Sequence, residues 1–260
     1  MNKITNQLKK QISGIDSIEG RLEVLKDKYK GKTAVILCTG PSLNDYDHEE
    51  MRDMFSKRDD LVIMPMKQAY GVSQETSDFH IQNLWSMDRK TPTKYKNIEN
   101  TISFFNVAKS FTEEHLEMII DNDHPCDLWA PCLNPPYVTD KDTIQATGNY
   151  DLFWMLSKET QTMWGKTLLY SSAIPIALHI GCRSIVTIGW DLGTGVHFYP
   201  EKSPWSVIAN KPDVKYTNEA VETTPQLYEW CKTNNINFRI LSDINPADDR
   251  IERLKTIQDI

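Results

Sequence analysis

The chain has 260 residues and a net charge of −7, with 40% hydrophobic and 25% charged residues. These values are ordinary for a folded globular protein, and the acidic balance counts against broad nucleic-acid binding. The five cysteines are odd in number, no apolar run is long enough to cross a bilayer, and the N-terminus lacks the apolar region of a signal peptide. We therefore expect reduced thiols and a cytoplasmic protein without a transmembrane segment.

The first predicted elements are one or two amphipathic helices within residues 1–30, where Ile4, Leu8 and Ile12 recur at helical spacing. We treat this stretch as an N-terminal helical extension of a nucleotide-binding catalytic domain that spans residues 31–260. Six strand-like runs follow in that domain, at 33–38, 60–66, 78–84, 101–107, 184–190 and 236–241.

Helix-like stretches separate some of these strands, the clearest at 171–181, closed by Gly181, and at 219–234. Strands alternating with helices predict an α/β fold, with a Rossmann-like, mostly parallel sheet and helices on both faces. Two stretches rich in proline and glycine, 121–150 and 192–218, are predicted loops. The second follows a strand end, where ligands bind in open α/β sheets, so we expect it to form a lid.

The turn after the first strand, Thr39-Gly40-Pro41-Ser42, is the most informative segment. Gly40 lets the backbone turn sharply and approach a ligand, Pro41 pre-sets φ, and Ser42 can accept a bond from an early helical N–H. Because the N–H groups of a helix start attract anions, this turn predicts a phosphate site. An ordinary strand-to-helix turn is the alternative interpretation.

Polar residues follow other predicted strands as well, and in a parallel sheet they converge on the carboxyl edge. Together they describe a polar pocket of the size of a phosphate and a ribose. The residues in question are Lys67 and Gln68 after the second strand, Asn83 and Ser86 at the end of the third, and Asp191, His197 and Tyr199 after the strand at 184–190.

The Gly-Pro-Ser-Leu turn at 40–43 and the segment SSAIPIALHIGCRSIVTIGWDL together resemble the bacterial lipooligosaccharide sialyltransferases. They also resemble the MAF-type flagellin glycosyltransferases and the related 6-hydroxymethylpterin pyrophosphokinases. The resemblance extends, more thinly, over residues 31–250. It implies a GT-A-like variant of the Rossmann-like fold, with a loop-rich lid at 192–218, and a sugar–nucleotide transferase that needs no metal.

In that family the glycine turn holds the nucleotide phosphates, and lid tyrosines bind the leaving phosphate. The resemblance implies a catalytic role for Tyr199, which lies where one of those tyrosines would be, and His197 and Asp191 are further catalytic candidates because they lie close to it in the sequence. The family's general-base histidine maps near Asn218, so the base is left open among His197, the carboxylates of Asp191, Glu201 and Glu219, and a different reaction. The implied nucleotide- or phosphate-binding residues are Thr39, Gly40, Pro41, Ser42, Lys67, Gln68, Asn83, Ser171 and Gly189.

We therefore expect a glycosyltransferase that moves a sugar from a nucleotide-activated donor to an acceptor hydroxyl, with no cofactor. Diphosphate transfer to a small alcohol, which requires Mg²⁺ and ATP, and non-catalytic nucleotide binding are the alternatives. The acceptor stays open among a surface glycan, a protein and a hydroxylated DNA base, and a homo-oligomer is possible on this sequence.

Two other patterns have the form of metal sites. Asp121-Asn122-Asp123 matches an Asp-x-Asp signature, but it is better explained as the polar end of a helix. His124, Cys126 and Cys132 lack the paired spacing of a zinc site. We expect no metal in either place.

Overall fold

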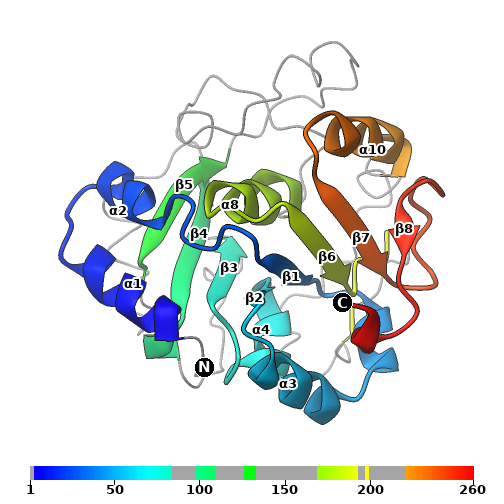
Figure 1. Ribbon diagram of the computed structural model, residues 1–260, viewed down its shortest axis with the longest axis horizontal. Coiled ribbons are helices and arrows are strands. Elements are labelled where there is room, and N and C mark those ends of the chain that lie inside the picture. Colours follow the sequence, from blue (N-terminus) through cyan, green and yellow to red (C-terminus); the bar gives the residue numbers. More distant parts are fainter. Residues whose placement is uncertain (1–2, 84–97, 109–125, 133–168, 193–196, 199–220) are drawn as a thin grey trace.

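The computed structural model describes residues 3–83, 98–108, 126–132, 169–192, 197–198 and 221–260 (Figure 1). Two sheets form its centre, one of five strands in the order β2-β1-β6-β7-β8 and one of three in the order β3-β4-β5. An isolated parallel bridge between Met66 and Ile81 links β2 to β3. Every strand pair is parallel. The strands are β1 Thr33–Leu37, β2 Leu61–Pro65, β3 Phe79–Asn83, β4 Ile102–Ala108, β5 Leu128–Cys132, β6 Ser184–Ile188, β7 Asn237–Leu241 and β8 Glu252–Arg253.

The central strands are apolar along their length because both faces of the sheet are covered. On β1, Ala34 and Ile36 belong to one hydrophobic core, whereas Val35 and Leu37 belong to another on the opposite face. Residues of the N-terminal helices and of α8 and α10 fill the first core, and α3 fills the second. This arrangement confirms the predicted α/β fold with a parallel sheet and helices on both faces.

The described helices are short, and those in the N-terminal stretch, α8 and α10 lie where helices were predicted. Within the described residues, none of them is long and apolar enough to span a membrane. The α-helices are α1 Lys3–Ser13, α2 Ile18–Leu25, α3 His48–Lys57, α4 Tyr70–Ser73, α8 Ile174–His179 and α10 Thr224–Thr233. The 3-10 turns are η1 Pro41–Asp45, η2 Lys67–Ala69, η4 Ile98–Asn100 and η6 Ile257–Asp259, and η5 Leu169–Ala173 is a π-helical turn.

The N-terminal helices α1 and α2 confirm the amphipathic pattern read within residues 1–30, and they pack beside the β3-β4-β5 sheet (Figure 1). Leu8 and Ile12 are buried in the core that also holds Ile36 of β1, whereas Ile4 is 38% exposed. Lys9 forms an ion pair with Asp127 at 3.0 Å. The separation of residues 1–30 from a domain at 31–260 stays a prediction, although both stretches contribute to one core.

The expected helix at 171–181 begins earlier, as the π-helical turn η5, and continues as α8 with Pro175 in its first turn. Gly181 ends it with φ +99°, in the left-handed region that glycine adopts most readily. The expected helix at 219–234 corresponds to α10. Two strands were not predicted, because β8 has two residues and β5 lies in the proline-containing stretch that was expected to be a loop.

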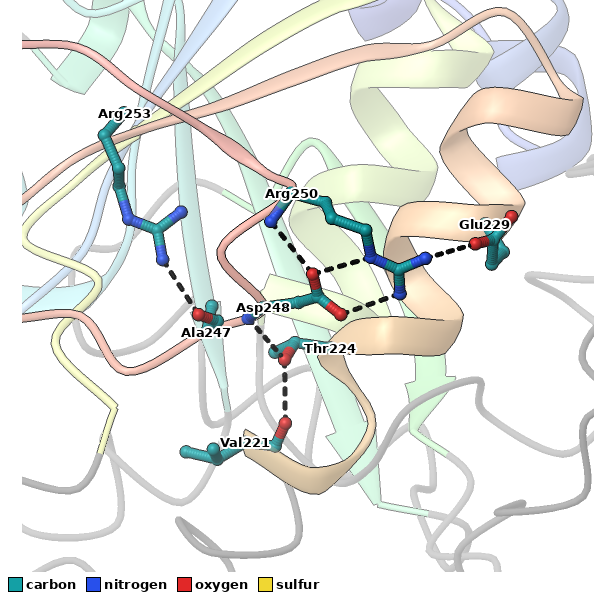
Figure 2. Close-up of polar contacts among 7 residues, drawn as sticks. All are labelled: Val221, Thr224, Glu229, Ala247, Asp248, Arg250 and Arg253. Atoms are coloured by element: carbon teal, nitrogen blue, oxygen red, sulfur yellow. Dashed lines mark hydrogen bonds and ion pairs between the residues drawn. The ribbon is translucent and has the colours of Figure 1, made fainter.

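A polar network ties α10 to the segment that follows β7 (Figure 2). The guanidinium of Arg250 donates to Asp248 at 2.8 and 2.9 Å and to Glu229 on α10 at 2.5 Å. Thr224 accepts from the backbone N–H of Asp248 at 2.9 Å and donates to the carbonyl of Val221 at 2.8 Å. This network holds the chain between β7 and β8 against α10.

Candidate functional site

The carboxyl edge of the sheet contains a point where the direction of strand order reverses. From β1 the chain moves to β2 on one side and returns, much later, to β6 on the other. In open α/β sheets ligands bind outside the carboxyl ends of the strands at such a switch point. The turns after β1 and β6 carry the two sequence blocks on which the family resemblance rests, and they meet here.

The β1 and β6 turns are fastened to each other by hydrogen bonds; we call this arrangement the switch-point latch. The N–H of Gly40 donates to the carbonyl of Gly189 at 2.8 Å. The carboxylate of Asp191 accepts from the N–H and the hydroxyl of Ser42, each at 2.6 Å, and from the hydroxyl of Ser242 after β7 at 2.5 Å. The latch therefore joins the ends of three strands.

The latch changes the interpretation of the Gly40 turn. A Cβ added at Gly40 would lie 2.4 Å from Asp191 Oδ2 and 2.5 Å from the Gly189 carbonyl oxygen. The space on the Cβ side of Gly40 is therefore filled by the protein itself, and the Ser42 N–H donates to Asp191. The predicted phosphate site at this turn stays a prediction. Asp191 is 8% exposed and accepts hydrogen bonds from Ser42 and Ser242, so its carboxylate has a structural role in the latch, and its predicted catalytic role stays a prediction.

Lys67 lies after β2, next to the latch, and is half-buried. Its φ of +48° places its backbone in the left-handed region. Among the described residues, no carboxylate or other acceptor pairs with its ammonium group, and burial lowers its pKa. A partly desolvated cation without a counter-ion in the described part of the chain favours an anionic ligand. Gln68, the next residue, is half-buried as well.

His197 and Phe198 lie across the β1 turn, on the carbonyl of Thr39. The N–H of Phe198 donates to that oxygen at 3.0 Å, and His197 Nδ1 lies 3.3 Å from it. Because a carbonyl only accepts, this contact assigns the hydrogen to Nδ1 and the lone pair of the neutral ring to Nε2. The pKa of His197 is lowered by burial and by the nearby Lys67 charge, against the raising effect of the Thr39 bond.

The structure thus brings Thr39, Lys67 and His197 to one edge, beside the latch. Of the predicted lid at 192–218, only Leu192, His197 and Phe198 are described. Asn44 Nδ2 donates a hydrogen bond to the Phe198 carbonyl at 2.5 Å. Tyr199 lies outside the described residues. The side chains of Asn83, at the end of β3, and Ser171, in η5, also lie outside them, so their proposed contacts stay predictions.

Three other residues at this edge were not among the predicted site residues, although Asn245 lies in the region of the family resemblance and His80 was interpreted from the sequence as structural. The Ser242 hydroxyl donates a hydrogen bond to the Asp191 carboxylate, and the Asn245 side chain donates one to the Trp190 carbonyl. His80 lies beneath Lys67 and donates from Nε2 to its carbonyl at 3.0 Å. Ser242 follows a predicted strand end, which was a usable signal. His80 lies inside a strand, and nothing in the sequence distinguishes it from a packed core residue.

Within the described part of the chain, no three His, Cys, Asp or Glu side chains are grouped to hold a metal ion. The described cysteines, Cys38, Cys126, Cys182 and Cys231, are free thiols. Asp121 and Asp123 lie outside the described residues. The expectation that no metal takes part therefore stays a prediction.

The chain is an α/β protein with a Rossmann-like parallel sheet. No family model and no curated protein matches it. A solved structure that matches is a tyrosine-to-phenylalanine variant of the sialyltransferase CST-II in complex with CMP. It is 13% identical, with 84% of this chain and 83% of that chain covered, at a TM-score of 0.48. This is a distant likeness.

Proposed function

We propose that the chain is a glycosyltransferase that takes a sugar from a nucleotide-activated donor, with Lys67 and His197 at the centre of its site. The observation that carries the proposal is a half-buried lysine with no acid partner among the described residues, beside a histidine and a topological switch point. The family resemblance supports the proposal separately from Lys67 and His197. The two sequence blocks that carry it meet at this same place, where Gly40 bonds to Gly189 and Ser42 bonds to Asp191.

In the proposed reaction the donor phosphate lies against the Lys67 ammonium. The bond between the sugar carbon and the phosphate oxygen breaks, and the negative charge that develops on the leaving nucleotide is stabilised by Lys67. His197 Nε2 takes the proton from the acceptor hydroxyl, whose oxygen forms the new bond to the sugar carbon. The lowered pKa keeps the His197 ring neutral at pH 7, so Nε2 can accept this proton.

Other residues take supporting roles in this proposal. Gln68, Asn83 and Ser171 contact the nucleotide or the sugar, and Tyr199 donates to the leaving phosphate. The Gly40 turn shapes the floor of the site through the latch rather than by binding the phosphate with the Ser42 N–H. The acceptor carries a hydroxyl, and its class stays open among glycan, protein and modified nucleobase.

The first experiment is a thermal-shift panel of nucleotides and nucleotide sugars with and without EDTA. A specific ligand at 100 times its Kd stabilises the protein by about 2.7 kcal/mol. We expect at least one nucleotide sugar to reach this shift and EDTA to leave it unchanged. A shift that requires Mg²⁺ and ATP identifies diphosphate transfer instead.

The second experiment measures nucleotide release from the donor that binds. Lys67→Gln removes the cation, and His197→Asn keeps an amide donor near Thr39 while removing the base. Both are expected to reduce turnover at least 100-fold, whereas Lys57→Gln on the exposed face of α3 is the matched control. Binding with no turnover by the unaltered chain identifies a non-catalytic nucleotide-binding protein.

A further inference from the structure

Lys67 adopts a backbone conformation that its residue type disfavours. Three described residues other than glycine have positive φ, at +58° for Asp27, +48° for Lys67 and +53° for Asn235. Asp and Asn are the residue types that enter this region most readily after glycine, and lysine is not among them. Such a conformation persists only where the surrounding structure fixes it, and it is concentrated at functional sites.

A buried side-chain network fixes the Lys67 backbone from below. His80 on β3 is 0% exposed, and its Nε2 lies 3.0 Å from the Lys67 carbonyl oxygen. Gln82 Nε2 donates to His80 Nδ1 at 3.1 Å. The His80 ring stacks on Tyr70, with centroids 4.3 Å apart and planes 19° apart, and the Tyr70 hydroxyl lies 3.0 Å from Thr101 Oγ1.

One tautomer of His80 satisfies both of these hydrogen bonds. The Lys67 carbonyl only accepts, so Nε2 carries the hydrogen, and the lone pair on Nδ1 accepts from the Gln82 amide. The ring is held in its plane by Tyr70. The Lys67 carbonyl is therefore directed inward toward His80, and the residue is fixed at the edge of the sheet where His197 also lies.

We infer that His80 is a positioning residue that sets Lys67 as the lysine that binds the phosphate of a nucleotide ligand. The class of ligand in this inference rests on the proposed function. The positioning role rests on the contact between His80 and the Lys67 carbonyl. His80 does not contact the ligand. It acts by holding the Lys67 backbone in the left-handed conformation, so that binding does not have to order this residue.

Two variants of His80 separate positioning from packing. His80→Phe keeps a ring to stack on Tyr70 but removes the donor to the Lys67 carbonyl. His80→Gln keeps an amide donor that can reach the same carbonyl. Gln82→Met, which removes the donor to His80 Nδ1, is a milder second variant in case His80→Phe does not fold. Lys67→Asn keeps a residue that tolerates positive φ but removes the ammonium charge.

The assay is calorimetric titration with inorganic pyrophosphate and with UDP, at several salt concentrations, on each variant of the full chain. We expect at least tenfold weaker binding for His80→Phe, three- to fivefold for Gln82→Met, and less than threefold for His80→Gln. Lys67→Asn is expected to abolish pyrophosphate binding. Ile12→Val in α1 is the stability control, which lowers Tm without changing affinity or its salt dependence.

The outcomes distinguish this inference from the proposed function. If the His80 and Gln82 variants bind both ligands as the unaltered chain does while Lys67→Asn does not, His80 is structural and the inference is wrong. If the expected affinities appear but no sugar donor is turned over, the positioning role stands and the proposed transfer falls. If the unaltered chain binds neither pyrophosphate nor any nucleotide or nucleotide sugar of the thermal-shift panel, both fall.

Discussion

Substituting Gly40 by alanine tests whether the switch-point latch is packed as tightly as the structure shows. The backbone of Gly40, with φ −74° and ψ 161°, suits alanine, so the cost is steric alone. The new Cβ would lie 2.4 Å from Asp191 Oδ2, where ordinary contact begins at 3.4 Å, so the two atoms must separate by 1.0 Å. The carboxylate is held by three hydrogen bonds, and the next obstacle is the Gly189 backbone.

The contact can be relieved by a shift of the surrounding backbone or by movement of the Asp191 carboxylate away from one of its donors, and both lower the free energy of unfolding. Overpacking costs 1–3 kcal/mol, and loss of one charge-assisted hydrogen bond costs roughly 1.5–3 kcal/mol, so we expect Gly40→Ala to lose about 3 kcal/mol. For a chain of this size that lowers Tm by roughly 6–12 °C. Urea unfolding and calorimetry measure both quantities. Gly14→Ala is the control, since its Cβ would meet only the Gln11 carbonyl at 3.8 Å. A loss below 0.5 kcal/mol for Gly40→Ala refutes the packing argument.

Three further predictions follow from other contacts. Ser242→Ala removes one donor to Asp191 and is expected to cost about 2 kcal/mol in urea unfolding, with nucleotide affinity unchanged; a tenfold loss of affinity would contradict this. Burial raises the pKa of Asp78 to about 6, above its usual 3.8, so the contribution of this group to stability falls by about 2.5 kcal/mol as pH rises from 4 to 7, and Asp78→Asn flattens this slope. The acid limb of the turnover–pH profile has its midpoint below the usual histidine pKa of 6.5, and Lys67→Gln moves it upward; an unmoved midpoint excludes His197 as the base.

The parallel sheet could be predicted from the sequence because its central strands are continuously apolar. The five residues of β2, Leu61–Pro65, are all buried, and such runs separated by helical spacing leave few other folds. The strand β5, Leu128–Cys132, contains Pro131, and a strand with proline in it reads locally as a loop. The two residues of β8 are Glu252 and Arg253, and they carry no periodic pattern at all.

The sequence predicts which turns lie at the candidate site, but it does not show which residues pair with each other over long distances in the chain. The turn at Gly40 has the composition of an anion site, and local reasoning leaves the Ser42 N–H available. Its acceptor, Asp191, is 149 residues away in the sequence, and only the tertiary structure shows that the two meet. The left-handed backbone of Lys67 is likewise invisible in the sequence, since lysine is not a residue type that signals it.

The latch can form only late in synthesis, because its residues are far apart in the sequence. Chains leave the ribosome from the N-terminus, and the turn after β1 emerges long before its partners. The Ser42 groups stay hydrated until Asp191 has been made, and Asp191 gains its third donor only 51 residues later, with Ser242. A nascent or prematurely terminated chain that ends before residue 191 therefore carries Lys67 without the completed latch.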